Sequence, residues 1–395
     1  MDGYAGRRLE IAVRDRARFG AGVVADLPAV VAELGGLAAF VVTDSGVVSS
    51  GIAGRVVDLL TAADLQVEVF DGVEANPGTS SVARGSAVLR RFLDLAGATS
   101  VVVALGGGSA MDSAKAMALH AANDRDVTSL GYHDETLLPG VPVIAVPTTA
   151  GTGAETNTYG VITDEVAGRK GYVGHESVLP RVAILDPELT LGLPPGPTAA
   201  TGVDALTHSL ESLLSKNPNP FAEAIALGVI RTVREWLPRA VENGSDLEAR
   251  SRMLLAAHYA GVGQQSGTGV GAVHAIGHAI GTRGRLAHGT SLATVMPEVF
   301  ATYLTVRERE LALVAIALGV AAPGDPPADA ARAGIEAIDG LLRRVGQRRT
   351  LAAQGLGDET HDTIAQDSIE DAAINNSPRL PTKPEILEIL AAVGG

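Results

Sequence analysis

Residues 100–122 read SVVVALGGGSAMDSAKAMALHAA, and this stretch decides the fold prediction. It starts with a short apolar run, passes through three consecutive glycines, and continues in a segment of helical character. An apolar run without alternation is typical of a strand that is buried on both faces. The glycines therefore lie at a predicted strand-to-helix turn, as in sheets whose parallel strands are joined by helices.

Similar apolar runs recur through the first half of the chain. Helix-like segments lie near residues 51–64, 79–96 and 109–122. Strands and helices that alternate in this way predict an α/β domain with a parallel sheet and helices on both of its faces. The expected strands are Leu37–Thr43, Val67–Phe70, Ser100–Leu105, Val141–Val146 and Val182–Leu185.

The second half of the chain has a different pattern. From about Thr198 onward, apolar residues recur with helical spacing, for example over 221–237, 247–261, 305–318 and 328–344. Before this region, the prolines at 187, 194, 195 and 197 are expected to break any helix. We therefore expect an α/β dinucleotide-binding domain over residues 1–190 and an all-helical domain over residues 191–395.

Length and composition agree with two domains and limit the partners. A chain of 395 residues suggests about two domains. The net charge of −14 argues against nucleic acid, because binding to phosphates requires a basic face. With no cysteine, the chain has no disulfides and no thiolate metal ligands. No signal peptide or membrane span is expected, so the prediction is a cytoplasmic protein without a membrane partner.

Two loops follow predicted strands and have the composition of phosphate-binding turns. Backbone N–H groups at a glycine-rich strand-to-helix turn can bind a phosphate with the help of the helix dipole. The first loop lacks the GxGxxG pattern, and an ordinary tight turn is the alternative for each loop. In a parallel sheet both loops would open onto the same edge. The residues concerned are Gly106, Gly107, Gly108 and Ser109 in the first loop and Thr148, Thr149 and Thr152 in the second.

Asp44 stands at the end of an earlier predicted strand, in the sequence VVTDSG. A carboxylate there can accept hydrogen bonds from the ribose hydroxyls of adenosine, and it would repel a 2′-phosphate. This interpretation favours NAD over NADP. The alternative is that Asp44 caps a helix, which is a common role for aspartate.

Five of the nine histidines fall between residues 208 and 288. Asp204 and His208 are four residues apart, as are His274 and His278, so each pair shares one face of a helix. His288 follows shortly after. One carboxylate and several imidazoles suit a divalent metal such as Fe²⁺ or Zn²⁺. The alternative is a set of core or interface histidines with structural roles.

Several motifs together resemble the iron-containing (group III) alcohol dehydrogenases. They are GGGSAMDSAK, PTTAGTGAE, VITD, TGVDALTHSLE and GAVHAIGHAIG with the later AHG, and the resemblance extends over nearly the whole chain. It implies an NAD(P)-binding α/β domain, an all-helical metal domain and hydride transfer between an alcohol or carbonyl and nicotinamide. The metal ligands that it implies are Asp204, His208, His274 and His288.

The same resemblance assigns further roles. His278 matches a histidine that faces the substrate or nicotinamide and is not a ligand. The cofactor residues that the resemblance implies include Asp112 in the first motif and Lys170 near the nicotinamide ribose. The resemblance also leads us to expect a homodimer or a larger homo-oligomer. The chain departs from the family pattern at Glu155, Thr156 and Asn157, and again over residues 282–286.

Three questions stay open at the level of sequence. A dehydroquinate-synthase-like lyase or cyclase would share the architecture, NAD and a metal, although the motif from Asp204 to His208 favours a dehydrogenase. A non-enzymatic protein with a structural metal is a second alternative. Arg283 and Arg285 either bind an anionic group of the substrate or pair with acidic side chains of the protein.

Overall fold

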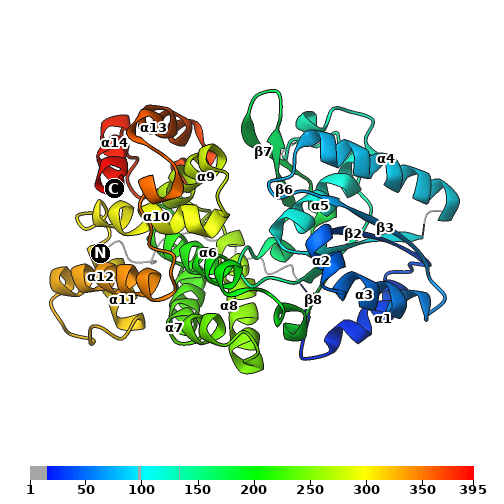
Figure 1. The fold of residues 1–395 in the computed structure, drawn as a ribbon, viewed down its shortest axis with the longest axis horizontal. Coiled ribbons are helices and arrows are strands. Elements are labelled where there is room, and N and C mark those ends of the chain that lie inside the picture. The colour runs from blue at the N-terminus through cyan, green and yellow to red at the C-terminus, as the bar shows by residue number, and fades with distance from the viewer. Residues whose placement is uncertain (1–15, 97–98, 133) are drawn as a thin grey trace. The chain divides into compact units, whose positions relative to one another are not determined.

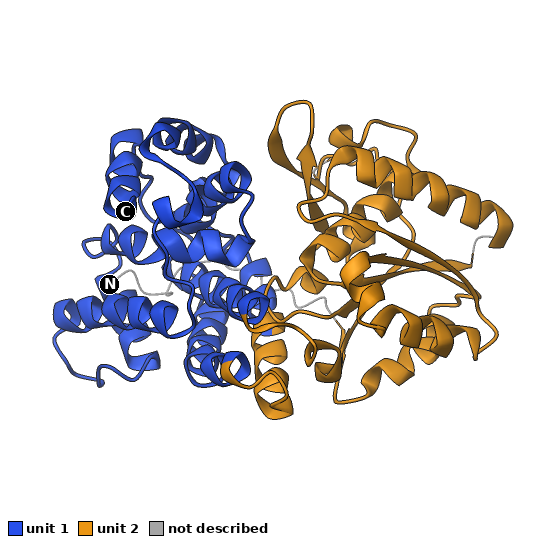
Figure 2. Cartoon of the chain, in the orientation of Figure 1, with its two compact units in different colours: residues 1–14, 196–241, 259–395 blue, residues 15–195, 242–258 orange. Residues whose placement is uncertain are grey.

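The computed structural model describes residues 16–96, 99–132 and 134–395, and the predictions for residues 1–15 lie outside these ranges. The described residues form two compact units, which Figure 2 colours separately. Among the described residues, the α/β unit contains residues 16–195 together with residues 242–258. The helical unit contains residues 196–241 and 259–395. The chain thus enters the α/β unit twice, whereas the sequence indicated one boundary near residue 190.

A six-stranded parallel sheet forms the centre of the α/β unit, with the order β1-β8-β5-β4-β2-β3. Strands β2, β3 and β8 are labelled in Figure 1. The predicted parallel sheet is confirmed, and all five expected strands are present. The edge strand β1 was not predicted, because its three residues carry no recognisable pattern. The strands are β1 (Ala17–Phe19), β2 (Ala38–Asp44), β3 (Gln66–Val73), β4 (Ser100–Gly106), β5 (Val143–Pro147) and β8 (Val182–Leu185).

Both faces of the sheet are buried, which explains the apolar runs in the sequence. Along β2, Phe40 and Val42 point into one hydrophobic cluster and Ala39 and Val41 into another. Alternate side chains of a strand point to opposite faces, so burial on both faces requires apolar residues at every position. Helices α4 (Thr79–Ala96) and α5 (Gly108–Ala122) contribute to the first cluster, and α1 (Leu27–Glu33) and α3 (Ile52–Thr61) to the second.

Smaller elements complete the α/β unit. An antiparallel hairpin, β6 (Tyr159–Asp164) and β7 (Arg169–Gly174), packs against α5 and was not predicted. Helix α2 (Ser45–Ser49) follows β2 directly. The 3-10 helices of the two units are η1 (Val23–Asp26), η2 (Val127–Ser129), η3 (Ala154–Thr156), η4 (Glu176–Val178), η5 (Pro187–Thr190), η6 (Ala352–Gln354), η7 (Asp358–Thr360) and η8 (Ala372–Asn376).

The helical unit confirms the helix-rich second half of the chain (Figure 1). Helix α8 belongs to both units, because its residues up to His258 are part of the α/β unit. No helix among the residues that the structure describes is long and apolar enough to cross a membrane. The helices are α6 (Pro195–Leu214), α7 (Pro220–Glu242), α8 (Leu247–Gln265), α9 (Ala272–Gly284), α10 (His288–Ala301), α11 (Glu308–Ala317), α12 (Pro327–Arg344), α13 (His361–Glu370) and α14 (Lys383–Ala392).

One prediction at the start of this unit was wrong. Pro195 and Pro197 were expected to break any helix, yet both lie in the first turn of α6. The N–H groups of the first turn have no partner within the helix, so proline loses nothing there, and its fixed φ suits the helix. The helix that carries Asp204 and His208 therefore starts at the proline cluster.

Candidate metal centre and cofactor loops

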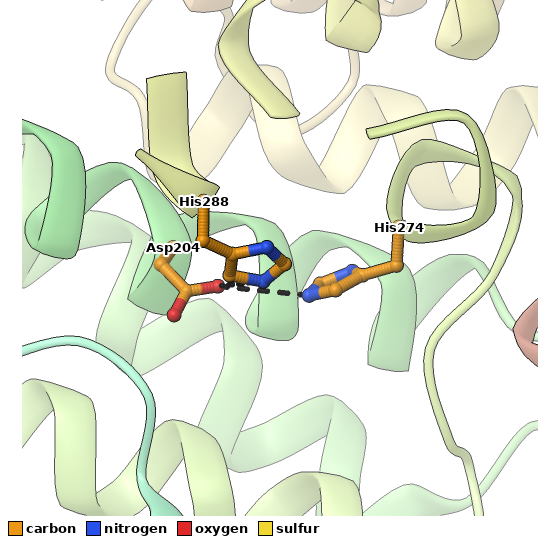
Figure 3. Close-up of side chains that lie close together, drawn as sticks. All are labelled: Asp204, His274 and His288. Atoms are coloured by element: carbon orange, nitrogen blue, oxygen red, sulfur yellow. Dashed lines mark ion pairs between the residues drawn. The ribbon is translucent and has the colours of Figure 1, made fainter. Parts of the chain in front are cut away.

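Three helices of the helical unit bring Asp204, His274 and His288 together (Figure 3). Asp204 lies within α6, His274 is the third residue of α9, and His288 is the first residue of α10. The close approach of α10 to α6 depends on Gly289, the residue after His288. A Cβ atom on Gly289 would lie 1.8 Å from the carbonyl oxygen of Ala200, so only glycine fits there.

The distances within this group suit a single metal ion. Asp204 Oδ1 lies 3.4 Å from His288 Nε2 and 3.6 Å from His274 Nε2. All three ligand atoms lie within 4.8 Å of one another. Bonds of about 2.1 Å in a tetrahedral centre place neighbouring ligand atoms about 3.4 Å apart. The side chains are therefore spaced as ligands of one cation.

Burial of two of these atoms gives independent support for a cation. Asp204 Oδ1 and His274 Nε2 are buried, and neither has a hydrogen-bond partner among the described residues. Leaving such atoms buried and unpaired is unfavourable, and native structures rarely do so. A divalent ion bound between them would satisfy both atoms, so the residues present fit the metal that the sequence predicted.

His208 lies beside the group but is not one of its three members. Its Nδ1 atom is 3.7 Å from Asp204 Oδ1, and its ring stacks on that of His274 with centroids 4.8 Å apart. The structure thus brings all four predicted ligands together. The role of His208 as a fourth ligand stays a prediction.

His278 is next to the ligands but is held by another residue. Its ring stacks on that of His288, with centroids 5.2 Å apart, and its Nδ1 lies 2.7 Å from Asp371 Oδ2. Asp371 is itself fixed, because its Oδ1 accepts a hydrogen bond from the amide of Ala373. Burial alone would raise the pKa of Asp371, but the hydrogen bond and charge of His278, together with the amide of Ala373, outweigh it and lower that pKa. Nδ1 of His278 is therefore engaged by Asp371.

Glu211 lies behind His274, and sequence reasoning missed it. Its Oε2 atom is 2.6 Å from His274 Nδ1. Burial opposes protonation of His274, but the carboxylates of Glu211 and Asp204 outweigh it and raise the pKa of His274 to about 9. Glu211 follows Asp204 by seven residues, which places both on one helix face. That spacing was the available signal.

In the α/β unit, the candidate cofactor residues lie where the strand order reverses. From β2 the chain moves outward to β3, then returns to β4 on the other side of β2 and continues outward to β5. Ligands of open α/β sheets bind outside the carboxyl ends of the strands at such a point. Asp44 ends β2, and Gly106 ends β4.

The two glycine- and threonine-containing loops lie against each other at this edge. The amide of Thr148 donates to the carbonyl of Gly106 at 2.9 Å. Cβ atoms built on Gly107 and Gly108 would lie 3.2 Å from Thr149 Cγ2 and 2.7 Å from Thr152 Cγ2, respectively. The first loop leads into α5, with Ser109 in its first turn. The structure therefore brings the predicted loop residues together at one helix N-terminus.

Asp44 caps α2 and also faces the glycine loop. Its Oδ1 atom accepts hydrogen bonds from the amides of Gly46 at 2.8 Å and Val47 at 3.0 Å. Its Oδ2 atom lies 3.3 Å from the place where a Cβ atom of Gly106 would be. Gly106 has a φ of 149°, which glycine adopts more readily than other residues. Capping and ribose recognition are therefore compatible, because they use different oxygens.

Asp112 lies one turn further along α5 and pairs with a buried lysine. Its Oδ1 atom is 3.5 Å from Nζ of Lys115, which has no exposed surface. Burial raises the pKa of Asp112, while Lys115 and, more weakly, Lys170 on β7 oppose the rise. Lys170 is therefore near enough to act on Asp112 electrostatically. Contact of either residue with a cofactor stays a prediction.

Two residues of the segment that departs from the family pattern after the second loop are buried and make contacts within the protein. Asn157 accepts a hydrogen bond from Nζ of Lys115, which also donates to the carbonyl of Ala154 at 2.9 Å. Glu155 is buried and lies 3.1 Å from Nδ1 of His258 on α8. The side chains of Glu155 and Asn157 thus make internal contacts within the α/β unit.

Arg283 pairs with an acidic side chain of the protein, which was one of the two alternatives that the sequence left open. Its Nε and Nη2 atoms donate to Asp367 Oδ2 at 2.9 and 2.6 Å, linking α9 to α13. Arg285 is exposed and ends α9 in the left-handed conformation, with a φ of 51°. Binding of a substrate anion by either arginine stays a prediction.

Comparison with known proteins gives the family. The family described as iron-containing alcohol dehydrogenase matches residues 15–187. The C-terminal family of Fe-containing alcohol dehydrogenases matches residues 198–394. Together the two matches extend over nearly the whole chain.

Individual relatives agree with these matches. The chain is 35% identical to the NAD-dependent methanol dehydrogenase of Bacillus methanolicus, with 94% of this chain and 96% of that protein covered. It is 34% identical to the lactaldehyde reductase of Escherichia coli K12, with 95% and 97% covered. Its structure resembles that of a 1,3-propanediol oxidoreductase with a TM-score of 0.92, at 32% identity and with 98% and 100% covered.

Proposed function

This chain belongs to the iron-containing alcohol dehydrogenase family, and from that premise we propose that it interconverts small alcohols with the matching aldehydes or ketones, using NAD(H). The protein is an oxidoreductase acting on CH–OH groups. None of the relatives described above is a lyase, and so the cyclase alternative has no support among them.

The group formed by Asp204, His274 and His288 carries the proposal. Two of its ligand atoms are buried and have no hydrogen-bond partner in the part of the chain that the structure describes, and the distances suit one divalent cation. We propose His208 as the fourth ligand, in keeping with its position beside Asp204. Fe²⁺ is the metal that the family name indicates, and Zn²⁺ suits the same donors.

Each part of the site has a separate task. When bound, the metal supplies Lewis-acid polarisation of the alcohol or carbonyl oxygen, and nicotinamide supplies the hydride acceptor or donor. His278 holds or releases a proton at Nε2, while Asp371 keeps its ring in place through Nδ1. The amides at the start of α5 and the hydroxyls of Thr149 and Thr152 bind the pyrophosphate.

Finer features of the function are also part of the proposal. Asp44 favours NAD over NADP, because its charge would repel a 2′-phosphate. An acid-bearing aldehyde is the substrate to test for binding of an anionic group by Arg285. The cytoplasmic location and the homo-oligomer are tested by cell fractionation and by light scattering of the purified protein.

The test of the function is a steady-state assay of the metal-loaded protein. We expect NADH formation with small alcohols and NADH oxidation with small aldehydes, both abolished by a chelator and restored by Fe²⁺ or Zn²⁺. NADPH run in parallel measures the cofactor preference. No turnover in either direction with either cofactor, after metal loading, would contradict the proposal.

A further inference from the structure

Glu211 is a buried carboxylate that no part of the proposed mechanism uses. It lies on α6, one turn beyond His208, and only 4% of its surface is exposed. Its two oxygens accept three hydrogen bonds from the start of α9. These come from the amides of Gly271 and Val273, both at 2.8 Å, and from Nδ1 of His274 at 2.6 Å.

Two of these hydrogen bonds cap α9. The first amides of a helix have no partner within it and are normally satisfied by a side chain at the N-cap. Gly271 occupies the N-cap of α9 and has no side chain to offer. Glu211 supplies the missing acceptor from another helix, and its negative charge is favourable at the positive end of α9. The carboxylate therefore ties α6 to the first turn of α9.

The third hydrogen bond sets the state of the His274 ring. A carboxylate only accepts hydrogen bonds, so Nδ1 of His274 must carry the proton. Once the ring is neutral, Nε2 presents its lone pair, and this is the atom 3.6 Å from Asp204 Oδ1. Carboxylates that hold a ligating histidine in this manner orient the ring and make it a stronger ligand.

We propose that Glu211 is a positioning residue of the metal centre, which orients the His274 ring and keeps the proton on Nδ1, so that Nε2 is the atom that binds the metal. This inference rests on the proposed metal site, because it assigns His274 as a ligand through Nε2. It differs from a simple capping role in one respect. A cap alone would affect the stability of α9 and leave the affinity for the metal unchanged.

The test compares two carboxylates that cap helices. Glu211→Gln keeps the size of the side chain, but its amide nitrogen must face at least one of the three N–H donors. Asp246→Asn is the matched control, since Asp246 Oδ1 caps α8 by accepting from the amide of Ala249 at 3.0 Å. The dissociation constant of Zn²⁺ is measured on the metal-free proteins, together with the absorption spectrum of the Co²⁺-loaded forms.

We expect Glu211→Gln to raise the dissociation constant of Zn²⁺ about 10- to 100-fold and to change the Co²⁺ spectrum. Asp246→Asn should leave both unchanged. A Glu211→Gln protein with a lower melting temperature but unchanged Zn²⁺ affinity and Co²⁺ spectrum would overturn the inference and leave Glu211 as a cap. If Glu211→Gln does not fold, Glu211→Asp gives the same test. The aspartate keeps the negative charge, but its side chain is one methylene shorter, so the carboxylate lies further from His274.

A third variant separates this inference from the proposed function. His274→Ala should lose most of its Zn²⁺ affinity. If it binds Zn²⁺ as tightly as the unmodified protein, the metal assignment itself is wrong. If His274→Ala loses the metal while Glu211→Gln keeps it, only the role of Glu211 is wrong.

Discussion

Asp371 lies behind His278 and provides the sharpest prediction about the chemistry. The change Asp371→Asn keeps the shape of the side chain and removes its charge. In one orientation the amide nitrogen faces Nδ1 of His278, which moves the ring proton to Nε2. In the other it faces the amide of Ala373 and loses the second contact of Asp371. Either orientation weakens control of the His278 ring.

The expected magnitude follows from the contact that is lost. A hydrogen bond to a charged group contributes about 1.5–3 kcal/mol, which corresponds to a roughly 10- to 150-fold fall in kcat. The assay is steady-state NADH formation by metal-saturated protein, with the metal content measured on the same samples. Asp371 is not among the three grouped ligands, so the metal content should not change.

Asp367 offers a matched control, because it lies in the last turn of α13, the helix that Asp371 directly follows. Its carboxylate pairs with Arg283, and 36% of its side-chain surface is exposed. An exposed ion pair contributes at most about 1 kcal/mol to stability, so Asp367→Asn should leave kcat nearly unchanged. An Asp371→Asn protein with unchanged kcat, or one that loses metal and activity in parallel, would refute this account of His278.

Three further predictions concern the cofactor, the helix contact and the metal-free site. Asp44→Asn keeps the acceptor that caps α2 and should improve the use of NADP relative to NAD roughly 10-fold or more in kcat/KM. Gly289→Ala should destabilise the protein by about 1–3 kcal/mol in thermal unfolding, because its Cβ would overlap a backbone oxygen, whereas Gly340→Ala, with open space around it, should not. Because the pKa of His274 is raised from 6.5 to about 9, its contribution to the stability of the metal-free protein is present below pH 6.5 and lost as the pH rises through 9. Chemical denaturation should show a loss of about 3 kcal/mol that a His274→Gln protein lacks.

The sheet could be predicted because burial on both faces leaves a strong trace in the sequence. Residues such as Val101, Val102 and Val103 are all buried, so no polar position interrupts the run. The hairpin formed by β6 and β7 could not be found in this way. It has one buried and one more exposed face and contains Arg169 and Lys170, and thus it lacks an apolar run.

The candidate site was predictable to the extent that its residues have local spacing. Asp204 and His208 share a helix face, and so do His274 and His278, which periodicity reveals. The partner of His278 could not be found, because Asp371 is 93 residues away and no local pattern marks it. Glu211 could have been found from its spacing to Asp204. The prediction for Pro195 and Pro197 was wrong because proline is tolerated in the first turn of a helix, and the sequence did not show that α6 begins there.

Metal content measured beside turnover in two histidine variants tests the central claim most directly. After loading with Fe²⁺ or Zn²⁺, His274→Ala should lose metal and NADH formation together, because it removes a ligand. His278→Ala should retain the metal and turn over roughly 10²-fold or more slowly, the usual effect of losing an acid–base group. Equal metal loss in both variants, or full activity of a metal-free His274→Ala protein, would contradict the account.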